Sequence, residues 1–442
     1  MAMVAGGAES AAGVERDGAR ISRKKKHMLD NVILVLNSGS SSLKFGVYSE
    51  VASALTSRLD RTPGGASPAP TTGGVRPLYR GEVERIGGGE GKIWLKDSDG
   101  KTVEEESKDF GQQSNAAKAV AEKLAKLALP KIDGIGHRVV HGGPSLTAHQ
   151  RITPQVLQTL DGAAHFAPLH VPAAIALIRE TEKLYPGVPQ FACFDTAFHT
   201  TMPKAAERLP LPKKYWDAGI RKYGFHGLSC ESIVYALRER MPRHLIVAHL
   251  GNGASVTAIV GGRSVDTTMG LTPTGGIIMG TRPGDLDPGV LLHLLKTGTD
   301  VETLGKILDK ESGLLGISGT ASDMRKLHEA ANSGDAEARL AIEMFARAAA
   351  KAIGGFAAVM GNLDTIVFTG GIGEHDGDIR ARICGGMEIF GVRLDELENR
   401  KNAAKISRSA SEVAVEVIES DEDGQIARHV VGLMGERRRA GD

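Results

Sequence analysis

Short apolar runs alternate with longer stretches of helical periodicity along the chain, a pattern typical of a mixed α/β protein. The apolar runs predict strands at residues 32–36, 43–48, 136–140, 191–194, 245–250, 256–260 and 365–368. Apolar residues at helical spacing predict one helix over 115–129, which Pro130 would end, and another over 336–360.

One local pattern occurs twice. Residues 36–41 and 250–255 each consist of the end of an apolar strand followed by a small polar turn, and a second strand follows both turns. Such a repeat predicts two similarly built domains that face one ligand.

Two segments lack the periodicity of a packed element. Residues 1–30 are small and polar and then basic, so we expect a disordered N-terminal tail. Residues 61–75 are rich in Pro, Gly and Thr, which predicts a mobile loop insertion.

Composition restricts the class of protein and its partners. The 442 residues suffice for two or three domains, and a net charge of +1 speaks against nucleic acid as a partner. No uninterrupted apolar run is long enough to span a membrane, so no membrane partner is expected. Three widely spaced cysteines favour a reducing compartment, and we expect a cytoplasmic protein.

Three small turns follow predicted strands and could hold phosphate groups: residues 37–42, 251–255 and 370–374. Turns without bulky side chains expose backbone N–H groups to which anions bind. An ordinary hairpin turn is the alternative for each of them taken singly. The common nucleotide and hydrolase motifs, such as GxxxxGK[ST] and GxSxG, do not occur.

Two arginines stand among glycine and apolar residues, where a guanidinium needs an anionic partner. Arg138 and Arg282 could pair with a protein carboxylate or with a ligand. Asp195 ends an apolar strand, a position typical of active-site carboxylates, although a helix N-cap is the alternative. The spacing of the histidines favours hydrogen bonding or phosphate contact over a zinc site.

Together these segments resemble the acetate kinase family, the acetokinase branch of the actin-like and sugar-kinase ATPase superfamily. The resemblance extends from residue 31 to about residue 430 and rests on seven segments that occur in the family's order. These segments are residues 37–45, 136–143, 194–199, 223–227, 249–255, 279–288 and 369–374.

The resemblance implies an α/β fold of two similar actin-like (ribonuclease H-like) domains around a cleft. The N-terminal domain would comprise 31–195 plus 420–442, and the nucleotide-binding domain would comprise 196–419. The implied reaction is reversible phosphoryl transfer from ATP to acetate by a cytoplasmic homodimer that uses Mg²⁺ or Mn²⁺.

The resemblance also implies roles for individual residues. Asp195, His226 and Arg282 would be catalytic, and Asn37 and Glu422 would be associated with the metal ion. Acetate would be bound by Arg138, Val140, Leu169, Phe225 and Pro273. ATP would be bound by Lys44, His249, Leu250, Gly251, Asn252, Gly253, Asp323, Met324, Arg325, Gly371, Ile372, Gly373, Glu374 and His375.

Three alternative functions stay open. A propionate kinase or a pyrophosphate-using acetokinase would share most of these motifs. A noncatalytic nucleotide-switched scaffold would share the phosphate turns, but it would not need the two arginines, Asp195 and His226 together.

Overall fold

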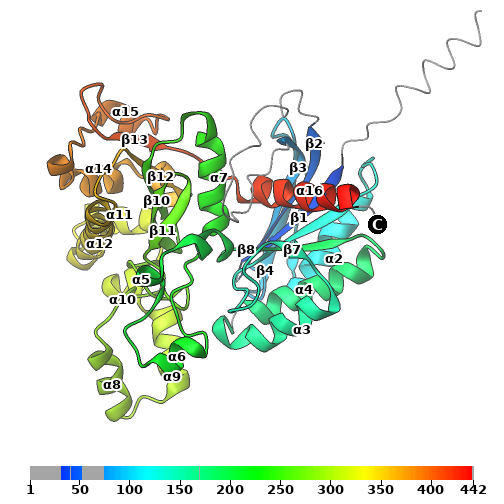
Figure 1. Cartoon of the computed structure of the whole chain (residues 1–442), viewed down its shortest axis with the longest axis horizontal. Coiled ribbons are helices and arrows are strands. Elements are labelled where there is room, and N and C mark those ends of the chain that lie inside the picture. Colours follow the sequence, from blue (N-terminus) through cyan, green and yellow to red (C-terminus); the bar gives the residue numbers. More distant parts are fainter. Residues whose placement is uncertain (1–30, 40, 52–73, 169, 441–442) are drawn as a thin grey trace, which may run out of the picture.

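The structure is a computed structural model, and it describes residues 31–39, 41–51, 74–168 and 170–440. The predicted tail at 1–30 and residues 61–73 of the predicted loop lie outside the described residues. The last two residues of that loop prediction are wrong, because Gly74 and Val75 begin a strand. Two β-sheets lie side by side, and helices cover each of them (Figure 1).

The first sheet has the strand order β5-β4-β3-β2-β1-β6-β8-β7 within the described residues. Its strands are β1 (Val32–Ser38), β2 (Leu43–Val51), β3 (Gly74–Glu84), β4 (Glu90–Asp97), β5 (Thr102–Asp109), β6 (Gly134–Val139), β7 (Gln150–Arg151) and β8 (Gln190–Phe194). Strands β1 to β5 form an antiparallel meander, whereas β1, β6 and β8 run parallel.

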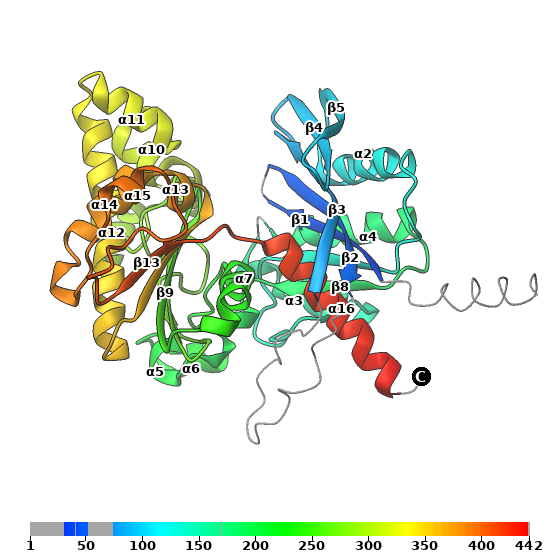
Figure 2. The same cartoon turned by 90° about the horizontal axis from the view of Figure 1, so that it is seen from above.

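Strand β1 shows why this sheet is central to its half of the molecule. Its run of apolar residues is buried on both faces, as is common for strands that pair in parallel. Leu34 packs toward α2 (Gln113–Ala125) and α4 (Val171–Leu184), whereas Ile33 packs toward α16 (Glu422–Ala440). Helix α16 ends the described chain yet lies across the first sheet (Figures 1 and 2).

The second sheet has the order β11-β10-β9-β12-β13. Its strands are β9 (His244–Leu250), β10 (Ala254–Val260), β11 (Arg263–Thr267), β12 (Thr365–Thr369) and β13 (Ala414–Val417). The long helix α12 (Ala336–Met360) packs on one face, and α7 (Gly227–Leu237) packs on the other.

Shorter helices complete the described structure. They are α3 (Pro154–Ala163), α5 (Lys204–Glu207), α6 (Lys213–Asp217), α8 (Pro288–Lys296), α9 (Val301–Lys306), α10 (Gly313–Ser318), α11 (Met324–Asn332), α13 (Gly370–His375), α14 (Gly377–Gly385) and α15 (Glu396–Arg400). None of the described helices is both long and apolar enough to cross a membrane.

The two sheets repeat one topology. In each, an antiparallel three-stranded meander is followed by two parallel strands on the other side of its first strand: β3-β2-β1-β6-β8 and β11-β10-β9-β12-β13. The two predicted strand–turn–strand units are the hairpins β1–β2 and β9–β10. The fold prediction, two similar α/β units, is confirmed, while the domain boundaries stay a prediction.

The predicted strands all fall within observed strands, apart from Val140, which lies one residue beyond β6. The helix predicted over 115–129 ends earlier, at Ala125, and Leu127 and Leu129 reach the core from a non-helical segment. The third predicted phosphate turn is instead the short helix α13. Strands β3, β4 and β5 went unpredicted because polar residues separate their few buried apolar ones, such as Val83, Ile93 and Leu95.

Candidate active site

A cavity of about 730 Å³ lies between the two sheets, and residues from both sheets line it. The predicted site residues that line it are Asn37, Lys44, Arg138, Val140, Asp195, Phe225, His226, His249, Gly251, Asn252, Gly253, Pro273, Arg282, Gly371, Glu374 and Glu422. The fold therefore brings together most of the predicted residues, although they are spread along almost 400 positions of the chain.

Asn37, Arg138 and Asp195 stand at one edge of the first sheet because they lie at the ends of neighbouring parallel strands. Leu36 pairs with His137 in the β1–β6 ladder, so the residues that follow them are neighbours as well. Asp195 directly follows β8. The carboxyl ends of parallel strands are where open α/β sheets bind their ligands.

Arg138 and Asp195 form a bidentate ion pair. Nε of Arg138 lies 3.1 Å and 3.0 Å from the two carboxylate oxygens, and Nη2 lies 2.6 Å from Oδ2. Burial opposes the charge on Arg138, but Asp195 and Glu422 outweigh it and raise the pKa of the guanidinium. Of the two partners considered for Arg138, the structure shows the protein carboxylate, while the same side chain also lines the cavity.

His226 precedes α7 in a left-handed backbone conformation, with φ of 56°. Such a conformation is uncommon for a residue with a side chain and is often found at functional sites. Its Nδ1 lies 3.0 Å from Ser255 Oγ, and its ring stacks on His249 with centroids 4.3 Å apart. Burial lowers the pKa of His226 well below its usual range, and the neighbouring His249 and Arg138 lower it further. The ring is therefore neutral at pH 7.

Arg282 reaches the cavity from the loop between β11 and α8. Its Nη1 donates to the carbonyl of Pro273 at 2.5 Å, and among the described residues it forms no salt bridge. Burial lowers the pKa of its guanidinium. A Cβ on Gly253 would lie 2.9 Å from Arg282 Nη2 and 3.2 Å from His226 Nε2. Glycine at 253 therefore allows these two donors to converge.

Side-chain oxygen atoms that could bind a metal ion lie close together at the start of α16. Asn37 Nδ2 donates to Glu422 Oε2 at 3.3 Å and to Asp423 Oδ1 at 2.8 Å. Burial opposes ionisation of Glu422, but Arg138, His249 and Lys44 outweigh it and lower its pKa. Burial raises the pKa of Asp423 to about 6. Hard oxygen ligands of this kind suit Mg²⁺ or Mn²⁺.

Two glycine segments of the second sheet lie side by side. Thr369 pairs with His249 in the parallel β12–β9 ladder, so the β9–β10 turn and the start of α13 are adjacent. Gly370 has a φ of 75°, and a Cβ there would lie 2.8 Å from the Leu250 carbonyl oxygen. Glycine is therefore required at this close approach.

Glu374 lines the cavity, but one of its oxygens is occupied by the protein itself. Oε1 accepts hydrogen bonds from Gly370 N at 2.8 Å, Ser420 N at 3.1 Å and Thr369 Oγ1 at 3.2 Å. Glu374 thus ties α13 to the segment that leads from the second sheet into α16.

Some predicted nucleotide contacts do not line the cavity: Leu250, Asp323, Met324, Arg325, Ile372, Gly373 and His375. Leu250 and Met324 are core residues. Asp323 caps α11 and pairs with Arg325 at 2.6 Å, and the side chains of Arg325 and His375 are largely exposed. Their roles stay predictions.

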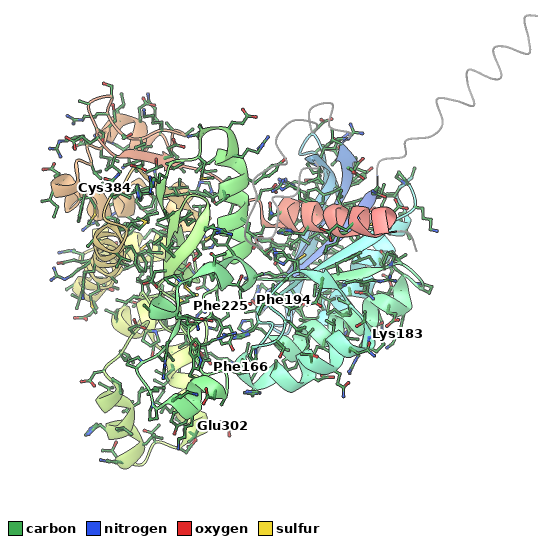
Figure 3. All side chains as sticks on the ribbon, viewed as in Figure 1. Phe166, Lys183, Phe194, Phe225, Glu302 and Cys384 are labelled. Atoms are coloured by element: carbon green, nitrogen blue, oxygen red, sulfur yellow. The ribbon has the colours of Figure 1, made fainter. Side chains whose placement is uncertain are left out.

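Four of the residues predicted to bind acetate are apolar and would form a wall beside it, and three of them, Val140, Phe225 and Pro273, line the cavity. Val140 and Phe225 are also buried in the core of the second sheet. Figure 3 shows Phe225 in the middle of the view, where the two halves meet. Leu169, the fourth residue of this wall, lies outside the described residues.

His170, Asp423 and Tyr48 line the cavity, although they were not among the predicted site residues. Burial, aided by Arg138 and Arg282, lowers the pKa of His170 to about 4. The acidic run that contains Glu422 is a signal for Asp423. Nothing in the sequence distinguishes Tyr48 from other buried strand residues.

Comparison with known proteins agrees with this geometry. The profile of the Acetokinase family matches residues 32–428. The acetate kinase of Bacillus subtilis is 40% identical over 414 residues, which cover 91% of this chain and 99% of the relative. The crystal structure of Porphyromonas gingivalis acetate kinase has a TM-score of 0.77 and 34% identity and covers 91% of this chain and 100% of that one. A propionate kinase from Francisella tularensis has a TM-score of 0.80 and 35% identity with the same coverage.

The duplicated sheet topology and a cavity lined by paired charges and glycine segments define a phosphotransferase of the actin-like ATPase fold. A carboxyl group is the acceptor in this class of enzyme. The chain belongs to the acetokinase family.

Proposed function

We propose that this protein transfers the γ-phosphoryl group of ATP to acetate, forming acetyl phosphate and ADP, and that it also catalyses the reverse reaction. The observation that carries the proposal is the convergence of the Arg138–Asp195 pair, His226 and Arg282 on one cavity. Phosphoryl transfer depends mostly on alignment and on neutralising charge, and these groups supply both.

The bond changes are simple. An acetate oxygen forms a bond to the γ-phosphorus while the bond from that phosphorus to the β,γ-bridging oxygen breaks, and ADP leaves with the electron pair. No net proton transfer is needed. Arg282, which has no carboxylate partner among the described residues, and neutral His226 would donate hydrogen bonds to the transferring group.

Arg138 and Asp195 would act as a unit at the acceptor end. Arg138 would contact the acetate carboxylate while Asp195 holds its guanidinium in place, as the bidentate pair allows. Val140, Leu169, Phe225 and Pro273 would face the methyl group.

Asn37, Glu422 and Asp423 would hold Mg²⁺ or Mn²⁺, because their oxygens suit a hard cation. When bound, the ion would neutralise charge on the phosphates. Lys44, the β9–β10 turn and Gly371 would lie along the nucleotide, and residues 323–325, Ile372, Gly373 and His375 would contact its adenosine side.

The test is hydroxylamine trapping of acyl phosphate with ATP, Mg²⁺ and acetate. We expect hydroxamate formation that requires all three components. ATP hydrolysis that is equally slow with and without acetate, with no hydroxamate, would instead support a nucleotide-switched scaffold. Replacing ATP with pyrophosphate in the same assay tests the pyrophosphate-using alternative.

Propionate is the second candidate acceptor, and the likeness to the Francisella tularensis propionate kinase favours including it. One methylene changes binding by only about 1–3 kcal/mol, so acetate should be preferred and propionate still used. Val140→Ala should shift kcat/KM toward propionate without changing the KM for ATP. Loss of stability with an unchanged acetate-to-propionate ratio would assign Val140 to the core alone.

We also propose a cytoplasmic homodimer. Helix α8 has no buried residue within one chain, yet Val290, Leu292 and Leu295 on it are apolar and exposed. A second copy of the chain would cover this surface, and Leu292→Asp should then shift the mass in sedimentation equilibrium toward a monomer. The cytoplasm suits the three cysteines, which are buried as free thiols.

A further inference from the structure

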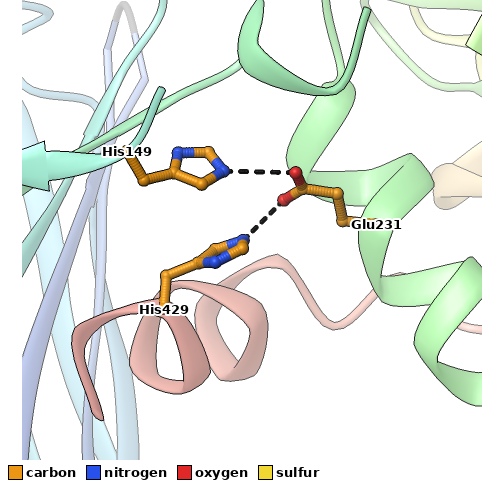
Figure 4. A group of neighbouring side chains, drawn as sticks. All are labelled: His149, Glu231 and His429. Carbon is orange, nitrogen blue, oxygen red and sulfur yellow. Dashed lines mark hydrogen bonds and ion pairs between the residues drawn. The ribbon is translucent and has the colours of Figure 1, made fainter. Parts of the chain in front are cut away.

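A second cluster of polar side chains lies behind the cavity and is separate from the residues discussed above. Glu231 on α7 lies between His149, which precedes β7, and His429 on α16 (Figure 4). His149 Nε2 lies 3.1 Å from Glu231 Oε1, and His429 Nε2 lies 2.6 Å from Glu231 Oε2. The centroids of the two imidazole rings are 3.9 Å apart.

Two histidines and a carboxylate at this spacing would be compatible with a metal ion, since their ligand atoms lie within 4.8 Å of one another. The hydrogen bonds argue against it. Phe194 N donates to His149 Nδ1 at 3.0 Å, so the ring proton of neutral His149 is on Nε2. Nε2 faces Glu231, and because it carries the proton it has no lone pair for a metal ion. A histidine that binds a metal carries its proton on the other ring nitrogen, which donates a hydrogen bond.

The same hydrogen bonds make the cluster a good site for a buried carboxylate. Burial opposes ionisation of Glu231, but His429 and His149 outweigh it and hold its pKa below the usual range. Glu231 therefore accepts a hydrogen bond from each ring. The buried carboxylate of Glu231 should hold its two histidine partners in place, because losing either hydrogen bond would leave the charge less stabilised.

Each member of the cluster lies on, or is hydrogen-bonded to, a segment that carries a residue of the proposed active site. His149 is bonded to the backbone of Phe194, the residue before Asp195. Glu231 is on the first turns of α7, which follows His226. His429 is two helical turns beyond Glu422 on α16.

We infer that the His149–Glu231–His429 cluster is a positioning device for phosphoryl transfer. Its hydrogen bonds connect the end of β8, which precedes Asp195, with the first turns of α7, which follow His226. They also connect α7 with α16, which begins at Glu422. None of the cluster's three residues lines the cavity. The inference rests on the proposed function, because alignment matters only if these groups act on one reaction.

Two substitutions of His149 separate its two hydrogen bonds. His149→Gln places an amide N–H near the position of Nε2 and keeps the bond to Glu231, whereas His149→Asn keeps an acceptor near Phe194 but cannot reach Glu231. We expect His149→Asn to lower kcat about 30-fold or more with the KM values for acetate and ATP within about threefold. His149→Gln should keep kcat within about fivefold of wild type, because the pairing of β7 with β8 still holds residue 149 beside Phe194.

His244→Ala is the control. It also removes a histidine–carboxylate contact, in this case the one from His244 Nδ1 to Asp364 at 3.1 Å, but at the start of β9, away from the cavity. It should leave kcat unchanged. If His149→Asn fails to fold, His429→Asn cuts only the link to α16 and should show the same fall in kcat at steady KM.

Hydrogen exchange measured by mass spectrometry gives a readout that does not depend on activity. In His149→Asn, peptides from both α7 and α16 should exchange faster, and in His149→Gln they should not. Normal kcat in His149→Asn, or a loss of kcat that Gln fails to restore, overturns the inference. Zn²⁺ that raises the melting temperature of wild type but not of His149→Asn would make the cluster a metal site and also overturns it.

The outcomes separate this inference from the proposed function. If wild-type protein forms no acetyl phosphate, the proposed function fails, and the positioning role for that reaction fails with it, whatever the exchange data show. If wild type is active and His149→Asn is equally active, the function stands and the positioning role is rejected.

Discussion

The two sheets share a strand order but present different groups to the cavity. In the first sheet, β6 has the sequence GIGHRV and brings Arg138 to the edge, whereas β12, at the same place in the second sheet, reads TIVFT and leads into glycines. The first sheet therefore presents paired charged side chains to the cavity. The second sheet presents glycine backbone, which a ligand can approach closely. A duplicated topology sets where a ligand is bound, and the side chains at each edge decide which part of the ligand is bound there.

The two arginines give the sharpest form of this comparison. Arg138, from the first sheet, is held by Asp195, whereas Arg282, from the second half, has no carboxylate partner among the described residues. We therefore expect Arg282 to contact the transferring phosphoryl group, and we expect Arg138 to stabilise the folded structure as well, through its ion pair with Asp195.

Arg282→Ala should have the largest effect. We expect kcat to fall by about 10³-fold, because a guanidinium on the transferring phosphoryl group contributes on this scale. The melting temperature should fall less than in Arg138→Ala, since Arg282 forms no salt bridge among the described residues and interacts with Asp309 only at longer range. Steady-state kinetics and thermal unfolding check both parts, and Arg282→Lys should be intermediate in kcat. A normal kcat would remove Arg282 from the proposed chemistry.

Arg138→Ala should behave differently. It leaves Asp195 buried and unpaired, so we expect a loss of about 3–5 kcal/mol in the free energy of unfolding together with a raised KM for acetate. Urea unfolding measures the first effect. Asp195→Asn should lower kcat, because it keeps the shape but removes the charge. Equal stability of Arg138→Ala and wild type would contradict the importance of the pair.

Substitutions at two glycines, Gly253 in the β9–β10 turn and Gly371 in α13, test whether a ligand approaches the backbone closely. Gly253→Ala should lower kcat by about 10- to 100-fold, because its Cβ would displace Arg282 and His226. Gly371→Ala is the matched control, since its Cβ meets no protein atom within 4 Å. It should raise the KM for ATP and leave kcat nearly unchanged. Identical kinetic defects in both variants would argue against separate roles.

The smallest expected effect is on the pH dependence of stability, and it concerns His137 in the first sheet. Burial lowers the pKa of His137 on β6 to about 4, although Gln190 accepts its hydrogen bond at 2.6 Å. The unfolded chain takes up this proton near pH 6.5, so the stabilisation is present above pH 6.5 and is lost as the pH falls toward 4.

Between pH 7 and 5.5 this histidine should account for a loss of about 1 kcal/mol in unfolding free energy. His137→Gln should reduce the measured loss by that amount in urea titrations at the two pH values. His165→Gln, which replaces an exposed histidine outside α8, should leave it unchanged. An unaltered pH dependence in His137→Gln would show that the pKa of this histidine is the same in the folded and unfolded states.

The sequence by itself determined the buried strands and the repeated hairpin, because a strand buried on both faces must be apolar throughout and a tight phosphate-binding turn must be small. β1 and the turn at 251–253 were found for these reasons. The family's motifs added Arg138, Asp195, His226 and Arg282, and the structure places all four around one cavity.

Tertiary structure alone decided which of these groups pair. The bond between Arg138 and Asp195 joins residues 57 positions apart, and the bond between Glu231 and His429 joins residues 198 apart. Helix or strand periodicity in the sequence cannot predict contacts over such separations. They depend on how the strands align in the sheet and on the packing of α16 against the first sheet. Strands β3, β4 and β5 also became recognisable only in the sheet, because their few apolar residues, such as Val83, Ile93 and Leu95, enter the core only when the strands pair with their neighbours.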